Sequence, residues 1–337
     1  MFQRVIVTGG EGFIGSNFVK LLWNETDYDI VNLDERKYSG RGNNIDHMGL
    51  IGNPRNPRYQ SVQGDICDSE LLSQLILEGD IIVNFAAESH VDRSLSRGSA
   101  EEFMTNNAVG AINLLEEALT KGVRKFVQIS TDEVYGSLEL DSVRKFKEGD
   151  ETKSGNPYSA SKAAAEQIAL AYHNSYGLPV VITRSSNNYG RYQFPEKFIP
   201  VAVTNLLEGK KIPIYGKGLN VRDWIHVEDN CRAILKVMEN GRNGEIYNIG
   251  GGNEISNIDL VCDILDVMHL DGNTGRYYEF VQDREGHDLR YALDNSKIRQ
   301  ELQWKPQVDF KEGLKRTIEW YKENETWWRA LKPEDKK

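Results

Sequence analysis

Short apolar runs alternate with longer amphipathic segments over the first half of the chain. The short runs are rich in β-branched residues, which predicts buried strands, and apolar positions every three or four residues predict helices between them. We expect strands at residues 4–8, 29–33, 62–66, 80–87, 125–129 and 178–183, and helices at 13–24, 100–121 and 157–176. This alternation predicts the α/β class, with a doubly wound parallel sheet covered by helices on both faces.

The alternation weakens from about residue 185. The elements expected there are a helix ending at 207, strands at 211–215, 221–225 and 245–249, and helices at 229–240, 256–269 and 310–325. We expect the larger domain to comprise residues 1–184 and to be rejoined by about 222–250. Residues 185–221 and 251–337 are expected to form a smaller lobe over the carboxyl ends of the strands, where α/β proteins bind their ligands.

The composition is that of an ordinary globular protein, with 39% hydrophobic and 27% charged residues. The net charge of −10 argues against nucleic acids and anionic membranes as partners. No apolar run approaches the roughly 20 residues of a membrane span. Residues 1–8 already belong to the first strand, so we expect no signal peptide. Cys67, Cys231 and Cys262 lack the spacing of metal ligands or of a disulfide framework, and we expect a cytoplasmic protein without a metal.

A glycine-rich turn follows the first strand. Gly9, Gly12 and Gly15 have the spacing of the dinucleotide-binding fingerprint, in which the glycines permit a tight turn, close approach of a pyrophosphate and contact between helix and strand. The helix that begins near Phe13 then directs its N-terminal amides at the phosphates. Because a strand precedes this turn and a helix follows it, the pattern predicts a dinucleotide site.

The choice of dinucleotide depends on the end of the second strand. Asp34 can accept hydrogen bonds from both ribose hydroxyls and repels a 2′-phosphate, which favours NAD over NADP, while the two basic residues that follow weaken this preference. Asp65 either meets the adenine edge or stabilises a turn, and small Ala86 and Ala87 leave room for the cofactor. The expected cofactor-binding residues are Gly9, Gly12, Phe13, Ile14, Gly15, Asp34, Asp65, Ile66, Ala86, Ala87, Asn106, Tyr158 and Lys162.

Tyr158 and Lys162 lie four residues apart on an expected helix, so their side chains share one face. Tyrosine normally titrates near pH 10, but the Lys162 ammonium and a positively charged nicotinamide both favour the phenolate. We therefore expect the pKa of Tyr158 to fall toward neutrality. The phenolate would remove the proton of a substrate hydroxyl while hydride leaves the same carbon for NAD⁺.

Asp132 and Glu133 follow Thr131 at the carboxyl end of the expected strand 125–129. Simple oxidation or epimerisation requires no such pair, so two adjacent carboxyl groups suggest a second proton transfer. If burial raises the pKa of one group, that group holds a proton as general acid while the other acts as base. This is what elimination of water next to a ketone requires. The alternative is a structural Asp–Glu turn capped by backbone amides.

Three arginines are candidates for binding a diphosphate, because guanidinium groups match phosphate oxygens. They are Arg222, Arg284 and Arg290, each of which alone is more often a surface or ion-pair residue. Arg222 is favoured because Trp224 lies close to it and suggests partial burial. His90, in the loop after the fourth strand, either contacts the substrate or bonds to the backbone, and the second interpretation is favoured.

Two motifs resemble those of the extended short-chain dehydrogenase/reductase superfamily. They are Thr8-Gly9-x-x-Gly12-x-x-Gly15 and Tyr158-x-x-x-Lys162. Further segments resemble its dTDP-glucose 4,6-dehydratase family over nearly the whole chain and in the expected order: 87–94, 130–136, 157–162, 186–190, 192–197, 222–224 and 286–288. The Thr-Asp-Glu triplet at 131–133 separates this family from sugar-nucleotide 4-epimerases, which usually carry small residues in place of the two carboxylates.

The resemblance implies a Rossmann domain that binds NAD, a smaller substrate-binding lobe, and a role for each motif. Tyr158, supported by Lys162, starts oxidation at C4, and Thr131 bonds the C4 oxygen. Glu133 takes the C5 proton, Asp132 protonates the departing C6 hydroxyl, and hydride returns to C6. The product is a 4-keto-6-deoxy sugar nucleotide for deoxysugar biosynthesis, such as that of rhamnose. The implied substrate-binding residues are Ser89, Thr131, Asn187, Glu196, Lys197, Arg222, Asn257, Arg284 and His287.

The family is homodimeric, which implies a homodimer packed through residues 100–121 and 157–176. The chain departs from the family at 284–291, where Arg-Glu-Gly-His-Asp-Leu-Arg-Tyr replaces Arg-Pro-Gly-His-Asp-Arg-Arg-Tyr and Glu285 adds a negative charge near the expected diphosphate. Alternative functions are a dehydratase of UDP- or CDP-glucose, a 4-epimerase, or a non-catalytic NAD sensor on the same fold. A sensor has no need of the phenol, the ammonium and both carboxylates together.

Overall fold

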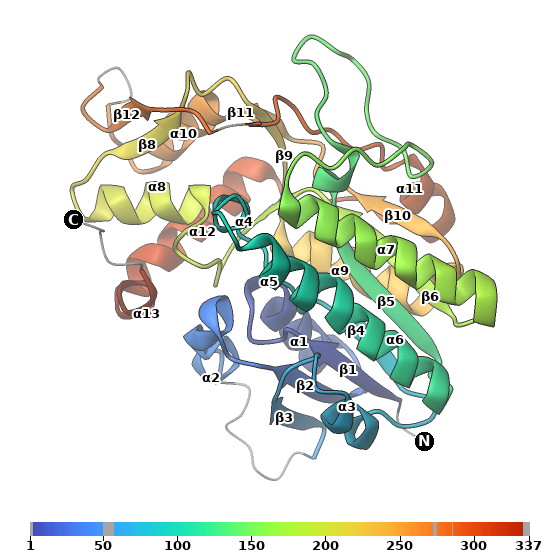
Figure 1. Ribbon diagram of the computed structural model, residues 1–337. Helices are drawn as coiled ribbons and strands as arrows, with labels where there is room; N and C mark the ends of the chain where they lie inside the picture. The colour runs from blue at the N-terminus through green and yellow to red at the C-terminus, as the bar shows by residue number, and fades with distance from the viewer. Residues whose placement is uncertain (1–2, 50–56, 272–274, 285, 333–337) are drawn as a thin grey trace.

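A computed structural model describes residues 3–49, 57–271, 275–284 and 286–332. Within these residues, seven strands form one parallel sheet in the order β10-β6-β5-β4-β1-β2-β3 (Figure 1). Each pairing in this sheet is parallel, so the predicted α/β class with a doubly wound parallel sheet is confirmed. The strands are β1 (Arg4–Thr8), β2 (Asp29–Asp34), β3 (Tyr59–Gln63), β4 (Ile81–Asn84), β5 (Lys125–Thr131), β6 (Val180–Ser185) and β10 (Ile246–Ile249).

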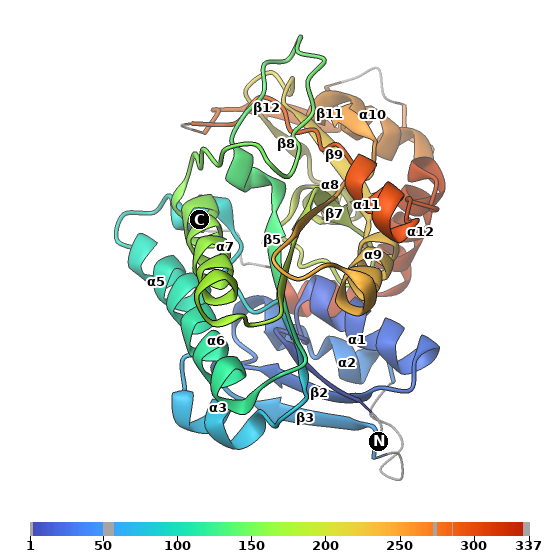
Figure 2. The ribbon, with the colours of Figure 1, turned by 90° about the vertical axis from the view of Figure 1, so that its right-hand side faces the viewer.

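Helices cover both faces of this sheet (Figure 2). One face carries α3 (Ser69–Leu75), α5 (Ala100–Met104), α6 (Gly110–Lys121) and α7 (Pro157–Tyr176), and the other carries α1 (Phe13–Glu25) and α9 (Val227–Asn240), with α11 (Ser296–Leu302) against α9 and β10. Two apolar clusters fill the interfaces, and their strand residues, such as Val7 and Ile6, alternate between the two faces. The central strands are therefore apolar on both faces, as the sequence predicts.

The predicted continuous helix over 100–121 is interrupted. A π-helical turn at Thr105–Val109 separates α5 from α6. Buried Asn107 accounts for its position, since its amide exchanges hydrogen bonds with the backbone of Glu88 and donates to the Ser161 hydroxyl. Such turns place one extra residue in a helix and often occur near functional sites.

Two small sheets lie beyond the carboxyl ends of the large one. The first consists of β7 (Asn187–Tyr189), β9 (Val221–His226) and β11 (Glu254–Ser256). The second consists of β8 (Ile212–Tyr215) paired with β12 (Tyr278–Val281). A third apolar cluster joins them to α8 (Phe198–Leu207), α10 (Asn257–Val267), α12 (Phe310–Glu323) and α13 (Glu325–Leu331). Of the stretch 222–250, β10 therefore joins the large sheet, whereas β9 pairs within a small one.

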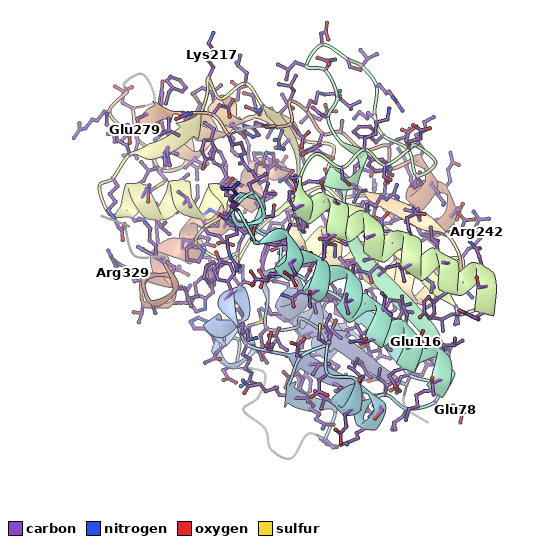
Figure 3. All side chains as sticks on the ribbon, in the orientation of Figure 1. Glu78, Glu116, Lys217, Arg242, Glu279 and Arg329 are labelled. Atoms are coloured by element: carbon purple, nitrogen blue, oxygen red, sulfur yellow. The ribbon has the colours of Figure 1, made fainter. Side chains whose placement is uncertain are left out.

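The remaining described elements are short and lie in loops. They are η1 (Tyr38–Gly42), α2 (Asn44–His47), α4 (Val91–Ser94) and the 3-10 turn η3 (Asp132–Tyr135). No helix among the described residues is long and apolar enough to cross a membrane. Charged side chains such as Glu78, Lys217 and Arg242 project from the outside of the molecule (Figure 3).

Candidate active site

The glycine turn between β1 and α1 is too crowded for side chains. Gly9 has a φ of +70°, and a Cβ there would lie 2.7 Å from the backbone nitrogen of Ala86. A Cβ on Gly15 would lie 2.2 Å from the carbonyl oxygen of Gly9. Gly12 is the N-cap of α1 and offers no capping side chain, so the first amides of this helix remain available for a ligand. The turn has the shape that a dinucleotide pyrophosphate requires.

Gly15→Ala is therefore expected to weaken cofactor binding by at least about tenfold, because the turn must open to admit the methyl group and the amides then lose their alignment. Isothermal titration with NAD measures this change. Gly149→Ala is the matched control, since its Cβ would meet nothing within 4 Å and its backbone does not require glycine. Equal affinity in the Gly15 variant and the wild type would contradict a role for this turn in binding.

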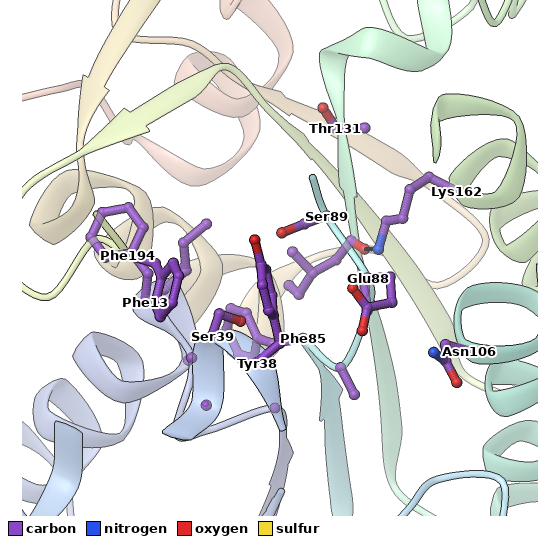
Figure 4. A pocket seen from close by; sticks show the side chains of 18 of the residues that line it. Phe13, Tyr38, Ser39, Phe85, Glu88, Ser89, Asn106, Thr131, Lys162 and Phe194 are labelled. Atoms are coloured by element: carbon purple, nitrogen blue, oxygen red, sulfur yellow. Dashed lines mark hydrogen bonds between the residues drawn. The ribbon is translucent and has the colours of Figure 1, made fainter. Parts of the chain in front are cut away.

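Every residue expected to bind the cofactor lines a single pocket at the carboxyl ends of β1, β2, β4 and β5 (Figure 4). Asp34 ends β2, and its carboxylate accepts hydrogen bonds from the amides of Glu11 and Arg36 at 2.9 and 2.7 Å. Burial raises the pKa of Asp34, while those two amides oppose the increase. Asp65 accepts a hydrogen bond from the Cys67 amide, as a turn-stabilising aspartate does, and also lines the pocket.

The helix α7 places Tyr158 and Lys162 in this pocket. Its start is fixed by Pro157 at its first position and by a capping box in which Asn156 and Ser159 bond each other's backbone amides. The Lys162 ammonium donates to the carbonyl oxygen of Ile129 at 2.6 Å. Burial lowers the pKa of Lys162 to about 8, against the opposing charge of Glu166.

The predicted fall in the pKa of Tyr158 is wrong for the protein's own groups. Burial raises this pKa above its ordinary value, the Glu133 carboxylate raises it further, and the hydrogen bond with Thr131 opposes both. The Lys162 ammonium does not offset them, since it points at the backbone of β5. A lower pKa therefore requires a further positive charge beside the phenol.

Asp132 and Glu133 lie in the same pocket, in the turn η3 that follows β5. The Thr131 hydroxyl caps this turn by accepting from the Glu133 amide, and it also donates to Asp132 Oδ1 at 3.3 Å. Asp132 is only 2% exposed, and its Oδ2 has no hydrogen-bond partner among the described residues. One carboxyl oxygen of Asp132 is therefore not used in stabilising the turn.

The two carboxyl groups differ in their electrostatic surroundings. Burial raises the pKa of Asp132 well above its usual range, and Glu133 and Asp223 add to the increase. Burial also raises the pKa of Glu133, but the cations of Lys197 and Arg222 hold it down. Asp132 is thus suited to hold a proton, and Glu133 is the better candidate for the ionised base.

The expected substrate-binding residues fall into two groups. Ser89, Asn187, Glu196 and Lys197 line the same pocket as the carboxyl pair. Burial raises the pKa of Glu196 to about 7, and the Lys197 ammonium donates to the carbonyl oxygen of Ser89 at 2.8 Å. The other group does not line this pocket and consists of Arg222, Asn257, Arg284 and His287.

The residues of this second group have polar partners of their own, most of them distant in the sequence. Arg222 donates to the carbonyl oxygen of Asp288 at 2.9 Å, and Arg284 pairs with Asp92 at 3.1 Å. His287 lies 2.7 Å from Asp283. Asn257 begins α10, and its amide donates to the carbonyl oxygen of Asn220. The cations of Arg222 and Arg284 nonetheless act on Glu133 and Lys197, so they lie beside the pocket.

Contacts bear on two further interpretations. Arg290 forms an ion pair with the half-buried Glu254 at 2.6 Å and does not line the pocket. His90 bonds to the backbone, as favoured, because its Nδ1 accepts from the Arg93 amide at 3.2 Å. Its Nε2 lies 3.5 Å from Glu196. Glu285 lies outside the described residues.

The pocket also contains residues that the sequence did not single out. Tyr38 from η1 lies against Phe194 with ring centroids 5.2 Å apart, so loops from the two halves of the chain meet across the pocket (Figure 4). Other lining residues are Ser39, Phe85, Glu88, Ser130, Ser185, Ser186, Asn188 and Gln193. No motif in the sequence marks Tyr38 or Ser39, which lie between β2 and β3. No group of His, Cys, Asp or Glu among the described residues has the arrangement of metal ligands.

Comparison with known proteins gives consistent matches. The family model described as GDP-mannose 4,6 dehydratase matches residues 6–317. A dTDP-glucose 4,6-dehydratase of Streptomyces niveus is 46% identical over 99% of this chain and 97% of its own length. The solved structure of DesIV, a dTDP-glucose 4,6-dehydratase of Streptomyces venezuelae with NAD and dTDP bound, is 46% identical with a TM-score of 0.92 and covers 98% of this chain and 100% of its own. That of Bacillus anthracis in complex with NAD is 45% identical, with a TM-score of 0.87 over 98% of this chain and all of its own.

Proposed function

This chain belongs to the GDP-mannose 4,6 dehydratase family, and we propose that it is, like the dTDP-glucose 4,6-dehydratases it resembles, an NAD-dependent lyase that converts dTDP-glucose to its 4-keto-6-deoxy derivative. The observation that carries this function is the pair Asp132–Glu133 in one pocket with Tyr158. An epimerase has no use for an acid and a base at this place, whereas removal of water needs both. The product enters deoxysugar biosynthesis.

The residues around the glycine turn fit NAD. The crowded glycines, the uncapped amides of α1 and the Asp34 carboxylate offer what a pyrophosphate and an adenosine ribose with a free 2′-hydroxyl require. When bound there, NAD supplies the hydride acceptor for C4 and the hydride donor for C6. The substrate needs no other oxidant or reductant.

The chain's own residues supply the proton transfers. Tyr158 takes the proton of the C4 hydroxyl, and Thr131, whose side chain lowers the pKa of the phenol, holds the C4 oxygen. Glu133 removes the C5 proton, which the C4 ketone makes acidic, and Asp132 gives its proton to the departing C6 hydroxyl. Glu133 returns its proton to C5 when C6 receives the hydride. The surroundings of the two carboxyl groups support this division, since Asp132 is the more strongly favoured in its protonated form. Lys162 orients Tyr158 from the same face of α7.

We assign the sugar end of the substrate to Ser89, Asn187, Glu196 and Lys197, which line the pocket. The diphosphate is assigned to Arg222 and Arg284, with His287 and Asn257 toward the nucleotide. In this proposal the NAD-binding domain comprises residues 1–184 and about 222–250, except β9, which pairs within a small sheet. The substrate lobe comprises 185–221 and 251–337, except α11, which packs on α9 and β10. Exposed Met104, Val109 and Tyr176 support a homodimer through residues 100–121 and 157–176. The free cysteines support a cytoplasmic location.

Incubation with dTDP-glucose, without added oxidant or reductant, tests the function. We expect a 4-keto-6-deoxy product, detected by mass spectrometry as a loss of one water, with no net change in NADH absorbance. UDP-glucose and CDP-glucose serve as matched substrates that differ only in the nucleotide. A product that keeps all its oxygen atoms but is inverted at C4 would identify an epimerase instead, and turnover of UDP-glucose or CDP-glucose alone would reassign the nucleotide.

A further inference from the structure

Arg184 lies near the carboxyl end of β6, the second strand from one edge of the large sheet, and outside the pocket that holds the candidate catalytic residues. It occupies β6 directly across from Ser130 of β5 and Asn248 of β10. Only 2% of Arg184 is exposed, so its charge must be balanced by the groups around it. Those groups come from the two segments that carry the candidate catalytic residues.

The first contact of Arg184 is with the helix α7. Its guanidinium forms a fork with the Glu166 carboxylate, with Nη2 at 2.6 Å and Nε at 3.1 Å from the carboxylate oxygens. Glu166 is completely buried. It follows Tyr158 and Lys162 at intervals of four residues, so all three side chains lie along one face of the helix. The ion pair therefore fixes the rotation of α7 about its axis and its position along that axis relative to β6.

The second contact is with the turn η3. The Arg184 guanidinium carbon lies 4.5 Å from the ring centroid of Tyr135, which ends the turn that begins at Asp132. The Tyr135 ring stacks on Phe146 at 4.8 Å, and its hydroxyl donates to Asn248 at 2.7 Å. A ring held on both faces and at its tip cannot move unless the turn moves with it.

We propose that Arg184 is a positioning residue that holds the two halves of the catalytic centre in register, by fixing α7 through Glu166 and the Asp132–Glu133 turn through Tyr135. This role rests on the proposed function, because it presumes that Tyr158 and the two carboxyl groups act on one substrate. Arg184 itself touches neither the pocket nor the reacting atoms. An arginine is required, since a lysine offers neither the planar fork for Glu166 nor a flat surface for the ring.

The test must separate positioning from stability. Arg184→Met alone leaves the Glu166 charge buried and unpaired, which is strongly destabilising, whereas replacing both members of a buried ion pair by apolar residues of similar size is often neutral. The variant that decides the question is therefore the double variant Arg184→Met with Glu166→Met. We expect it to be folded, with a Tm close to that of the wild type.

In the double variant we expect kcat with dTDP-glucose to fall roughly 10²-fold, because displacements near 1 Å have effects of that size. KM should stay within about twofold, since the residues assigned to the nucleotide are untouched. Stopped-flow absorbance of NADH should show both its appearance and its decay slowed, because the contacts reach both halves of the centre. Arg184→Lys, with Glu166 unchanged, should have a kcat between that of the double variant and that of the wild type.

Arg4→Met is the matched control, since Arg4 forms a similar fork with Asp80 at the opposite end of the sheet. It should change kcat by less than about twofold even where it lowers Tm. Wild-type kcat in the folded double variant would overturn the proposal. The proposal would also be overturned if Arg184→Met lost activity and the addition of Glu166→Met restored it fully. That result would show that the loss came from the instability of the unpaired Glu166 charge and not from misplaced catalytic residues.

A second measurement does not depend on turnover. Hydrogen exchange should become about tenfold faster at residues 132–135 and in the first turns of α7 in the double variant, and should be unchanged there in Arg4→Met. Equal protection in the double variant and the wild type would overturn the proposed positioning. If the wild type lacks dehydratase activity, the proposed function fails, and the exchange data still decide whether Arg184 fixes these two segments.

Discussion

Glu133→Gln is expected to oxidise C4 of bound dTDP-glucose and then to stall, so that NADH absorbance accumulates on the enzyme. Glutamine keeps the size and polarity of Glu133 but cannot take the C5 proton, and a positioned base contributes roughly 10²–10⁴-fold to a rate. Turnover should fall by that factor. The first step should not slow, because the Glu133 charge raises the pKa of Tyr158 and its removal favours the phenolate.

Stopped-flow absorbance at equal enzyme and substrate concentrations measures the stall, and mass spectrometry of the released sugar should find almost no loss of water. Glu78→Gln removes the same charge from the exposed surface and should behave as the wild type. Turnover of Glu133→Gln at the wild-type rate would contradict the role of Glu133 as the base. A variant that accumulates no NADH and forms no product would place Glu133 in C4 oxidation instead.

The sequence predicted those parts of the site that local rules determine. A fingerprint turn between strand and helix fixes where Gly9, Gly12 and Gly15 lie, and helical spacing alone places Tyr158 beside Lys162. The carboxyl ends of parallel strands meet at one edge, which brings Asp34, Ala86 and the 131–133 triplet into one pocket. Each of these inferences needs only neighbouring residues and the known direction of the strands.

Contacts between distant segments could not be predicted in this way. Arg290 is close in sequence to the expected diphosphate residues, but its ion pair is with Glu254, which lies 36 positions away. The π-helical turn in 100–121 depends on Asn107 meeting Ser161 across 54 positions. Arg184 lies just beyond the strand predicted at 178–183, and the observed strand β6 extends to Ser185 and includes it. The residues next to Arg184 in the sequence do not predict that it contacts Glu166 and Tyr135.

The pKa of Tyr158 shows the same limit for electrostatics. The spacing to Lys162 correctly predicts a shared helix face, but the direction of the ammonium depends on the carbonyl oxygen of Ile129, which belongs to another element. Burial then raises the pKa that the charge was expected to lower. The sign of a pKa shift therefore depends on all the groups around the titrating side chain. Whether that side chain belongs to a site can, in contrast, be predicted from the spacing of residues along the sequence.

Tyr158→Phe is expected to abolish the first chemical step, so that neither NADH absorbance nor product appears. The Phe ring keeps the edge-to-face contact with Phe103, whose centroid lies 6.4 Å away, and the pocket retains its shape. What is lost is the acceptor for the C4 hydroxyl proton. Lys162 cannot replace it, because its ammonium already carries its protons at neutral pH and donates to Ile129. Turnover should fall roughly 10²–10⁴-fold.

The comparison with Glu133→Gln makes this result diagnostic, since the two variants should stop the reaction on opposite sides of C4 oxidation. The double variant Tyr158→Phe with Glu133→Gln should show no NADH, because the earlier block hides the later one. Equilibrium binding of dTDP-glucose to Tyr158→Phe should stay within about twofold of the wild type, because one hydroxyl contributes little to ground-state binding. Oxidation of C4 by Tyr158→Phe at a rate near that of the wild type would require another base and would remove Tyr158 from the mechanism.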